Sequence, residues 1–205
     1  MTHIDAFILI GGRSSRLGTD KAFVELGGMT LAERAIANVG GGLPGAEVTM
    51  VAGSSPQFAI AAAASDVPFI FDLYEGRGPL GGLHAALAYA KAPWIFLLAC
   101  DYPFVSAGLI RLLSMKAGDR CGAVVPEQFD KRLQPLCAFY SVAKARPIVE
   151  EILQRPRMPP PMHEIVAMLD PLIVQYKDYQ HLDNASEAFL NINTLGDLER
   201  ARRAM

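Results

Sequence analysis

The sequence is poor in cysteine and histidine, and neither residue type forms a recognisable functional pattern. Cys100, Cys121 and Cys137 are an odd number without a C-x-x-C pair, and each lies in or beside an apolar run. This placement is typical of reduced thiols in the core of an intracellular protein. The four histidines are scattered and show neither a metal-binding spacing nor a Ser/His/Asp order. We therefore expect a cytoplasmic protein without a disulfide framework, a structural zinc site or a catalytic triad.

Long apolar runs and a strong net charge are also missing. The most apolar stretch, residues 92–100, is too short to cross a bilayer, and the N-terminus lacks the basic and apolar regions of a signal peptide. The 19 basic and 21 acidic residues give a net charge of -2, which argues against a general binder of nucleic acids or anionic membranes. Since 51% of the 205 residues are hydrophobic, we expect one globular domain that spans residues 1–205.

Short apolar runs alternate with helical patterns along most of the chain. Strands are expected at 6–10, 48–52, 68–71, 94–100, 121–126, 133–140, 172–176 and 189–193, and helices at 31–39, 79–89, 107–116, 141–154 and after Thr194. A further Ala-rich helix is expected to begin at Ser55 and Pro56. Because strands and helices alternate at βαβ intervals, the pattern predicts an α/β fold with a mainly parallel, Rossmann-like sheet covered on both faces.

Local signals indicate where several of these elements begin and end. Thr30 with Glu33 forms a capping-box pattern, and Thr194 is an expected N-cap of the final helix. The glycines at 40–42 are expected to end the helix that Thr30 begins. The proline-rich stretch 155–162 is expected to be a loop, which either borders a cleft or serves as a spacer.

The stretch from Ile8 to Lys21, which reads ILIGGRSSRLGTDK, is the strongest candidate for a ligand site. Gly11 and Gly12 stop the first apolar run, and without Cβ atoms they let backbone N–H groups approach a ligand closely. The residues behind them supply three cations and two hydroxyl donors, namely Arg13, Arg16, Lys21, Ser14 and Ser15. Such a loop after a strand suits a polyphosphate. The Walker and G-x-G-x-x-G spacings are absent, and an ordinary βα turn with surface arginines is the alternative.

Polar residues follow or end several predicted strands, where parallel α/β sheets bind their ligands. Asp72 and Asp101 each come directly after a strand, and Asn191 and Asn193 lie in the last one. Asp101 is predicted to bind Mg²⁺, since this ion takes one or two carboxylates together with phosphate oxygens; a helix cap or turn before Pro103 is the alternative. Asn193, and secondarily Asn191, could complete the metal shell or hold the acceptor substrate, and end-of-strand hydrogen bonding is an equal alternative for both asparagines.

The helix expected at 79–89 offers a second anion site. Gly78 to Gly82, which reads GPLGG, lies at its start, where free N–H groups attract a negative charge. Asp72, just before this helix, could accept a hydrogen bond from a base or ribose, or could cap its own loop. His84 lies one turn into the helix and is predicted to be structural rather than a general base.

Five strings in this order resemble the molybdenum cofactor guanylyltransferase family. They are GGRSSRLGTDK at Gly11–Lys21, GPLGG at Gly78–Gly82, LACDYPF at Leu98–Phe104, RLQPL at Arg132–Leu136 and NINT at Asn191–Thr194. The resemblance implies a three-layer α/β/α domain. It also implies an enzyme in which the terminal phosphate of molybdopterin attacks the α-phosphate of GTP, so that pyrophosphate leaves and a guanine dinucleotide forms.

The resemblance also implies roles for single residues. Catalytic roles fall on Arg16, Lys21 and Asp101. Nucleotide-binding roles fall on Leu9, Ile10, Gly11, Gly12, Arg13, Ser14, Lys21, Gly53, Asp72 and Asp101. Acceptor-binding roles fall on Gly78, Gly82, Asn191 and Asn193, and Mg²⁺ is expected on Asp101 and Asn193. The implied partners are GTP, molybdopterin, and the molybdoenzymes or insertion chaperones that receive the product, with no nucleic acid and no membrane.

Two departures from the family pattern bear on the choice of base. Ile10 replaces the alanine common before the two glycines, and Gly53 stands where relatives often have an asparagine that touches the nucleotide. The pair Gly11-Gly12 resembles the branch that uses GTP more than the branch that uses CTP. A cytidylyltransferase and a sugar-phosphate nucleotidyltransferase are the alternatives. A non-catalytic nucleotide-binding partner is disfavoured, because Arg16, Lys21 and Asp101 are all present.

Overall fold

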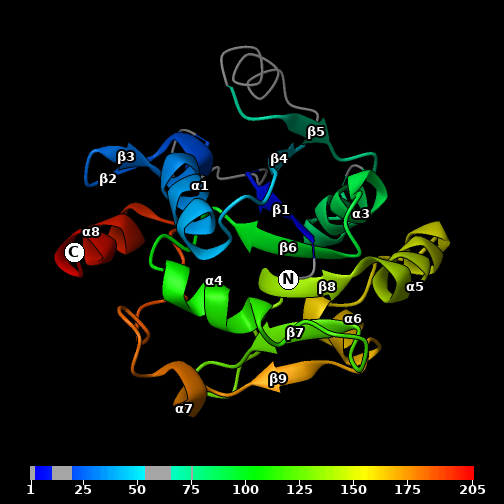
Figure 1. Ribbon diagram of the computed structural model, residues 1–205. Coiled ribbons are helices and arrows are strands. Elements are labelled where there is room, and N and C mark those ends of the chain that lie inside the picture. Colours follow the sequence, from blue (N-terminus) through cyan, green and yellow to red (C-terminus); the bar gives the residue numbers. More distant parts are fainter. Residues whose placement is uncertain (1–2, 11–19, 54–65, 75) are drawn as a thin grey trace.

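A seven-stranded sheet forms the centre of the computed structural model, which describes residues 3–10, 20–53, 66–74 and 76–205 (Figure 1). The strands are β1 (Ile4–Leu9), β4 (Val48–Ala52), β5 (Phe69–Phe71), β6 (Trp94–Ala99), β7 (Ala123–Pro126), β8 (Cys137–Ser141) and β9 (Leu172–Val174). Their spatial order is β5-β4-β1-β6-β8-β7-β9, and β8 runs opposite to the other six strands. The sheet is therefore mainly parallel, as predicted, and six strands end at one edge.

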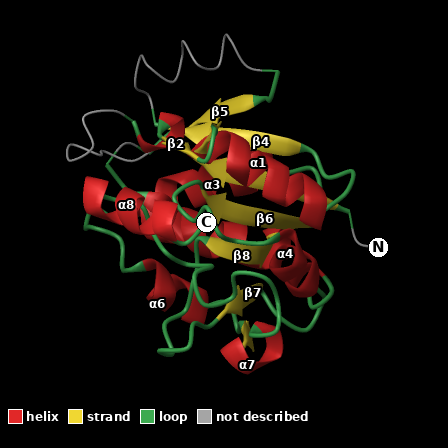
Figure 2. Cartoon of the chain, turned by 90° about the vertical axis from the view of Figure 1, so that its left-hand side faces the viewer, coloured by secondary structure: helices red, strands yellow, loops and turns green. Residues whose placement is uncertain are grey.

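Helices cover both faces of this sheet. They are α1 (Leu31–Gly42) and α4 (Ala107–Ser114) on one face, and α3 (Pro79–Tyr89), α5 (Val142–Gln154) and α6 (Met162–Ala167) on the other. Figure 1 shows α1 and α4 to the left of the sheet with α3 and α5 to its right, and Figure 2 looks onto the α1 and α4 side. This arrangement confirms the predicted three-layer α/β/α fold.

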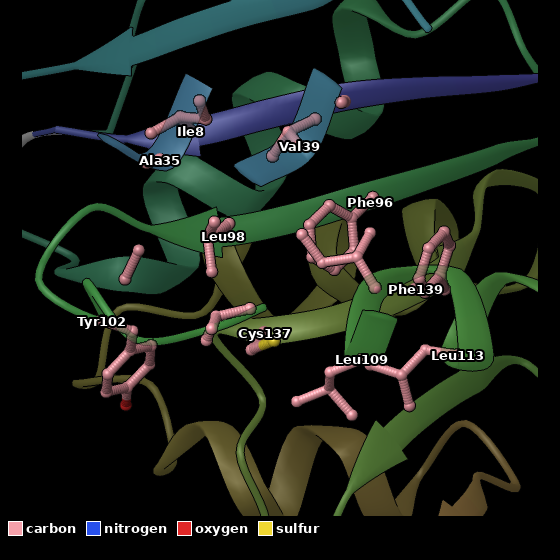
Figure 3. Packing of buried hydrophobic residues seen from close by; sticks show 14 of the residues in the cluster. Ile8, Ala35, Val39, Phe96, Leu98, Tyr102, Leu109, Leu113, Cys137 and Phe139 are labelled. Atoms are coloured by element: carbon pink, nitrogen blue, oxygen red, sulfur yellow. The ribbon is translucent and has the colours of Figure 1, made fainter. Parts of the chain in front are cut away.

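The two cores follow from the alternation of side chains along the strands. In β6, Phe96 and Leu98 point to the α1 and α4 layer, and Ile95 and Leu97 point to the α3 and α5 layer. Figure 3 shows the first core, in which Ala35 and Val39 of α1 and Leu109 and Leu113 of α4 pack over Ile8, Phe96, Leu98 and Phe139. All six residues of β6 are buried, because this strand lies in the interior of the sheet and is covered on both faces.

Several short elements lie at the edge where the parallel strands end. A one-turn 3-10 helix, η1 (Lys21–Phe23), leads into a small hairpin, β2 (Glu25–Leu26) and β3 (Met29–Thr30). The hairpin turns at Gly27 and Gly28, whose φ values of 61° and 79° favour glycine. The other helices among the described residues are α7 (Tyr176–Tyr179) and α8 (Leu195–Arg203). The capping boxes predicted at Thr30 and Thr194 are both present.

The prediction for the end of the first helix was wrong. Helix α1 continues through the glycines at 40–42 and stops at Leu43, the residue before Pro44, where the helical conformation is disfavoured. Gly42 serves packing instead of termination. A Cβ at this position would lie 2.7 Å from the Cβ of Ile110 and 3.0 Å from the carbonyl oxygen of Ala107 in α4. The glycine thus permits the close approach of two helices.

Two alanine substitutions in α1 test whether Gly42 is needed for packing against α4. Gly42→Ala is expected to lower the free energy of unfolding by about 1–3 kcal/mol, because its Cβ would force α4 away. Gly40→Ala is the matched control, since a Cβ there meets no atom within 4 Å. It is expected to raise the free energy of unfolding by about 0.5–1 kcal/mol through helix propensity. Urea denaturation of the two variants measures both effects, and a stabilising Gly42→Ala would contradict the packing role.

The last predicted strand was also wrong. Residues 189–193 form an irregular segment, which makes a backbone hydrogen bond from Ile192 N to Asp101 O at 3.2 Å. β6 is already paired with β1 and β8 on its two sides, so no edge was free for another strand beside it. Helix α6 and the single turn α7 were not predicted. The Ala-rich helix expected from Ser55 and Pro56 lies outside the described residues.

The expectation for the cysteines is confirmed. Cys100, Cys121 and Cys137 are buried free thiols. Burial raises the pKa of Cys100 and of Cys137, so both stay protonated and behave as core residues. Within the described part of the chain, no helix has the length and apolarity that crossing a membrane requires.

Candidate active site

Lys21 and Asp101 meet at the edge where β1 and β6 end, although 80 residues separate them in the chain. The ammonium of Lys21 donates to Oδ2 of Asp101 at 3.3 Å and also to Oδ1 of Asn193. The side chains of Lys21 and Asp101 are each 17% exposed, so water screens their charges only partly. Three residues that the sequence placed in one site therefore form one contact cluster.

Backbone hydrogen bonds from three parts of the chain hold this cluster. Cys100 N donates to Leu9 O at 3.0 Å, which joins the end of β6 to the end of β1. Ile192 N donates to Asp101 O at 3.2 Å, which places Asn191 and Asn193 beside the carboxylate. Asp197, at position N3 of α8, accepts from Asn193 N at 2.9 Å. The capping box of α8 thus also fixes the asparagine segment.

Lys21 is placed by its own local turn. Asp20 is the N-cap of η1, and its side chain accepts from Ala22 N at 3.3 Å. Ala22 is fully buried among residues of the α1 and α4 core. The turn of η1 is therefore anchored on that face of the sheet, and Lys21 reaches over the sheet edge from there.

Burial governs the electrostatics of Asp101. It raises the pKa of this carboxyl, whereas the charge of Lys21 and the side-chain amide of Asn191 oppose the rise. Oδ1 of Asp101 and Oδ1 of Asn191 are buried and have no hydrogen-bond partner among the residues that the structure describes. A buried oxygen without a hydrogen bond lowers the stability of the fold. One of these two oxygens belongs to the carboxylate of Asp101, whose other oxygen accepts from Lys21.

These oxygens fit a hard divalent cation. Mg²⁺ binds one or two carboxylates together with phosphate oxygens and water, and it prefers oxygen ligands. Asp101 would supply the carboxylate, and Asn191 and Asn193 would supply amide oxygens. In the described part of the chain, no three His, Cys, Asp or Glu side chains gather into a metal-binding group. A cation held by Asp101 would therefore need further oxygens from its ligand.

Asp72 lies over the start of α3. Its Oδ1 accepts from Tyr74 N at 2.7 Å, and its carboxylate fills the space in which Gly81 lacks a Cβ. A Cβ at Gly81 would lie 2.2 Å from Oδ2 of Asp72. The next residue, Gly82, packs against Leu9, whose Cδ2 would be 2.7 Å from an added Cβ. The two glycines therefore let α3 approach both Asp72 and the end of β1.

An alanine at Gly81 is expected to displace the Asp72 carboxylate. Because Asp72 is a predicted nucleotide ligand, Gly81→Ala should weaken nucleotide binding by about tenfold, which corresponds to one lost charge-assisted hydrogen bond. Gly118→Ala is the matched control, since an added Cβ there meets no atom within 4 Å. Calorimetric titration of both variants with GTP measures the difference. Equal affinities would show that Asp72 does not contact the nucleotide.

The other predicted site residues fall into two groups. Ile10 N donates to Val51 O at 2.9 Å, so Leu9, Ile10 and Gly53 lie at the ends of the neighbouring strands β1 and β4. Among the described residues, no atom lies within 4 Å of a Cβ built at Gly53. The remaining residues of the predicted phosphate loop, Gly11, Gly12, Arg13, Ser14 and Arg16, lie outside the described residues.

A glutamine pair beside the site was not predicted. Tyr102, directly after Asp101, donates its hydroxyl to Oε1 of Gln134 at 3.2 Å, and the amide of Gln134 donates to Gln128. Gln134 is only 7% exposed. The string RLQPL, which contains Gln134, supported the family resemblance, but no sequence pattern predicted a hydrogen-bond partner for this glutamine. The sequence signal that could have indicated this contact was the position of Gln134 between the apolar residues Leu133 and Pro135 in a predicted strand.

The comparisons with known proteins agree with this arrangement. The family described as MobA-like NTP transferase domain matches residues 6–166. A probable molybdenum cofactor guanylyltransferase of Pelotomaculum thermopropionicum is 33% identical over 204 residues, which cover 98% of this chain and 93% of that protein. A molybdenum cofactor guanylyltransferase of Desulfosudis oleivorans is 30% identical, with coverage of 100% and 97%.

A solved structure is similar over nearly the full length as well. Molybdopterin-guanine dinucleotide biosynthesis protein A from Archaeoglobus fulgidus aligns with a TM-score of 0.80 and 26% sequence identity, and the alignment covers 97% of each chain. The match of the family covers more than half of this chain and includes both Lys21 and Asp101. This protein therefore belongs to the MobA-like NTP transferase family, and it is a nucleotidyltransferase.

Proposed function

We propose that this enzyme transfers GMP from GTP to the terminal phosphate of molybdopterin, forming the guanine dinucleotide cofactor and pyrophosphate. The observation that carries the proposal is the cluster of Lys21, Asp101 and Asn193 at the sheet edge, where a buried carboxylate, a cation and an amide oxygen converge. The two relatives named as guanylyltransferases support GTP and molybdopterin as its substrates.

The chemistry needs positioning and charge more than a protein nucleophile. The attacking phosphate is already ionised, so no general base has to remove a proton from it. Lys21 neutralises negative charge that develops on the phosphates, and Arg13 and Arg16 of the same loop are proposed to add to it. Mg²⁺ bound to Asp101, with Asn193 as a second ligand, would supply a Lewis acid for the phosphate oxygens. Lys21 then has to leave Asp101 for the phosphates.

The choice of base rests on the sequence at the end of β1. The pair Gly11-Gly12 favours GTP over CTP, and Asp72 is proposed to accept hydrogen bonds from the nucleoside. Gly53 offers no side chain at the end of β4, so the base is held by fewer side-chain contacts there. Gly78 and Gly82, at the start of α3, are proposed to line the acceptor side.

Pyrophosphate release tests this proposal directly. The enzyme is incubated with ATP, CTP, GTP or UTP, with Mg²⁺, and with either molybdopterin or a sugar phosphate. We expect release only with GTP and molybdopterin together. Release that requires CTP, or that occurs with a sugar phosphate, would replace the proposal by one of the alternatives. Thermal stabilisation by GTP without any release would indicate a non-catalytic binding protein.

The product is proposed to pass to molybdoenzymes or to their insertion chaperones. A cytoplasmic location fits the three buried free thiols, since reducing compartments keep cysteines in that state. Pull-down of partners with the product-bound enzyme, compared with the GTP-bound enzyme, would test the transfer.

A further inference from the structure

Arg77 joins two loops that are 80 residues apart in the sequence. Its Nη1 donates to the carbonyl oxygen of Arg157 at 2.8 Å, and its Nη2 donates to that of Arg155 at 3.5 Å. One guanidinium thus holds two carbonyl groups of the stretch 155–161, which reads RPRMPPP and which we name the proline strap. A planar fork of donors suits such a double contact, and lysine could not reproduce it.

The loop that carries Arg77 is itself well fixed. Tyr74 N donates to Asp72, Arg77 N donates to Tyr74 O at 3.3 Å, and Gly78 adopts a φ of 58° before Pro79 begins α3. The ring of Tyr74 packs edge-on against His84, with ring centroids 4.8 Å apart. Hydrogen bonds and a ring contact thus connect the described residues on either side of position 75 with the N-terminal end of α3, where Arg77 lies.

The proline strap, in contrast, has few means to hold itself. Four of its seven residues are prolines, which have no backbone N–H to donate. Within the strap, Met158 is 72% exposed, and Arg157 is exposed as well. Contacts from outside, such as those of Arg77, therefore determine where the strap lies.

The position of the strap indicates which substrate it serves. In-line displacement puts the attacking and the leaving oxygens on opposite sides of the phosphorus. Lys21, which is proposed to assist the leaving pyrophosphate, is anchored through Ala22 on the α1 and α4 face. The strap leads into Met162, the first residue of α6, which packs against the α3 and α5 core on the opposite face. Gly78 and Gly82, which the resemblance assigns to the acceptor, lie at the start of α3 on that same face, so the strap lies on their side of the sheet.

We infer that Arg77 is a positioning residue that fastens the proline strap beside the start of α3, where the strap forms a wall of the acceptor pocket. The identity of the acceptor rests on the proposed function, whereas the fastening does not. Loss of Arg77 should release the strap and weaken acceptor binding, and it should leave GTP binding and the chemical step intact.

Limited proteolysis tests whether Arg77 fastens the proline strap, and it does not require an activity assay. Trypsin does not cleave before proline, so Arg157–Met158 is the one tryptic bond inside the strap. Arg77→Met is expected to raise the cleavage rate at this bond by about tenfold, because two hydrogen bonds to a charged group are lost. Cleavage at Lys116–Ala117 is the internal reference and should not change. Arg146→Met, which removes an exposed arginine of α5, is the matched control.

Kinetics and ligand protection test the acceptor role. Arg77→Met should raise the KM for molybdopterin by about tenfold, with kcat and the KM for GTP within about twofold of the wild type. Arg77→Lys should restore only part of the loss, since lysine has no fork of donors. An unchanged cleavage rate would overturn the fastening, and a raised GTP KM with a normal acceptor KM would overturn the acceptor role.

A failure of the proposed function can be told apart from a failure of this inference. If the wild type releases no pyrophosphate from GTP and molybdopterin, the proposed function fails. Protection of the Arg157–Met158 bond by molybdopterin in the wild type, absent in Arg77→Met, would still support the inference. No protection by molybdopterin, in a wild type that does release pyrophosphate from GTP and molybdopterin, would overturn the acceptor role of the strap.

Discussion

Asp101→Asn is expected to reduce kcat about a thousandfold while the protein stays folded, because the carboxylate is the only anionic ligand proposed for Mg²⁺. The amide keeps the shape of the side chain but removes its charge. Burial raises the pKa of Asp101, and a carboxyl with a raised pKa destabilises the fold at pH values above that pKa. Removing this charge offsets the lost contact with Lys21, so the Tm should stay within a few degrees of the wild type.

The measurement combines turnover at saturating GTP with calorimetric titration of Mg²⁺ in the presence of GTP. Asp101→Asn should lose both turnover and metal affinity. Asp119→Asn, which changes an exposed carboxyl, is the control and should alter neither. Full activity of Asp101→Asn at saturating Mg²⁺ would remove Asp101 from the catalytic site.

Lys21→Met is expected to reduce kcat about a hundredfold and, unlike Asp101→Asn, to destabilise the fold. The lost rate follows from the missing charge at the phosphates. The lost stability follows because Asp101 stays buried without its cation, and breaking such a pair from one side is unfavourable. With both side chains mostly buried, we expect a loss of about 2 kcal/mol in the free energy of unfolding.

Urea denaturation at neutral pH, together with kinetics, separates the two effects of Lys21→Met. Lys91→Met is the matched control, since the Lys91–Glu47 pair has side chains that are 70% exposed and should contribute little. The double variant Lys21→Met/Asp101→Asn should regain most of the stability, because it leaves no unpaired buried charge. Additive losses of stability in the double variant would contradict a direct pairing of the two residues.

Much of the fold could be predicted from the sequence, because local patterns dominate in its regular elements. The strand at 94–100 and the helix at 79–89 were recognisable from apolar runs and from Pro79 at the first helical position. The predictions failed where contacts between distant parts of the chain determine the structure. Gly42 was interpreted as a helix end because its neighbour α4 cannot be seen in the sequence. Residues 189–193 look like a strand, but they lie beside the end of β6, which already pairs with β1 and β8.

In the candidate site, too, some features could be predicted from the sequence and others depend on contacts between distant residues. The rule that ligands bind where parallel strands end placed Asp72 and Asp101 at one edge, and the structure agrees. The sequence could not predict that Lys21 would contact Asp101 and Asn193, because loop conformation, not spacing, brings their side chains together. Arg77 gave no signal, since its partners are backbone carbonyls, which every residue has.

The central claim is that this enzyme transfers the nucleotidyl group of GTP to molybdopterin, and isotope labelling tests it most directly. Wild-type enzyme is incubated with molybdopterin and Mg²⁺, using GTP labelled with ³²P at either the α or the γ position. We expect the α-label to appear in the dinucleotide product and the γ-label, once released from GTP, to appear only in pyrophosphate. Transfer of γ-label to molybdopterin, or retention of α-label in GTP while the enzyme binds it, would contradict the account.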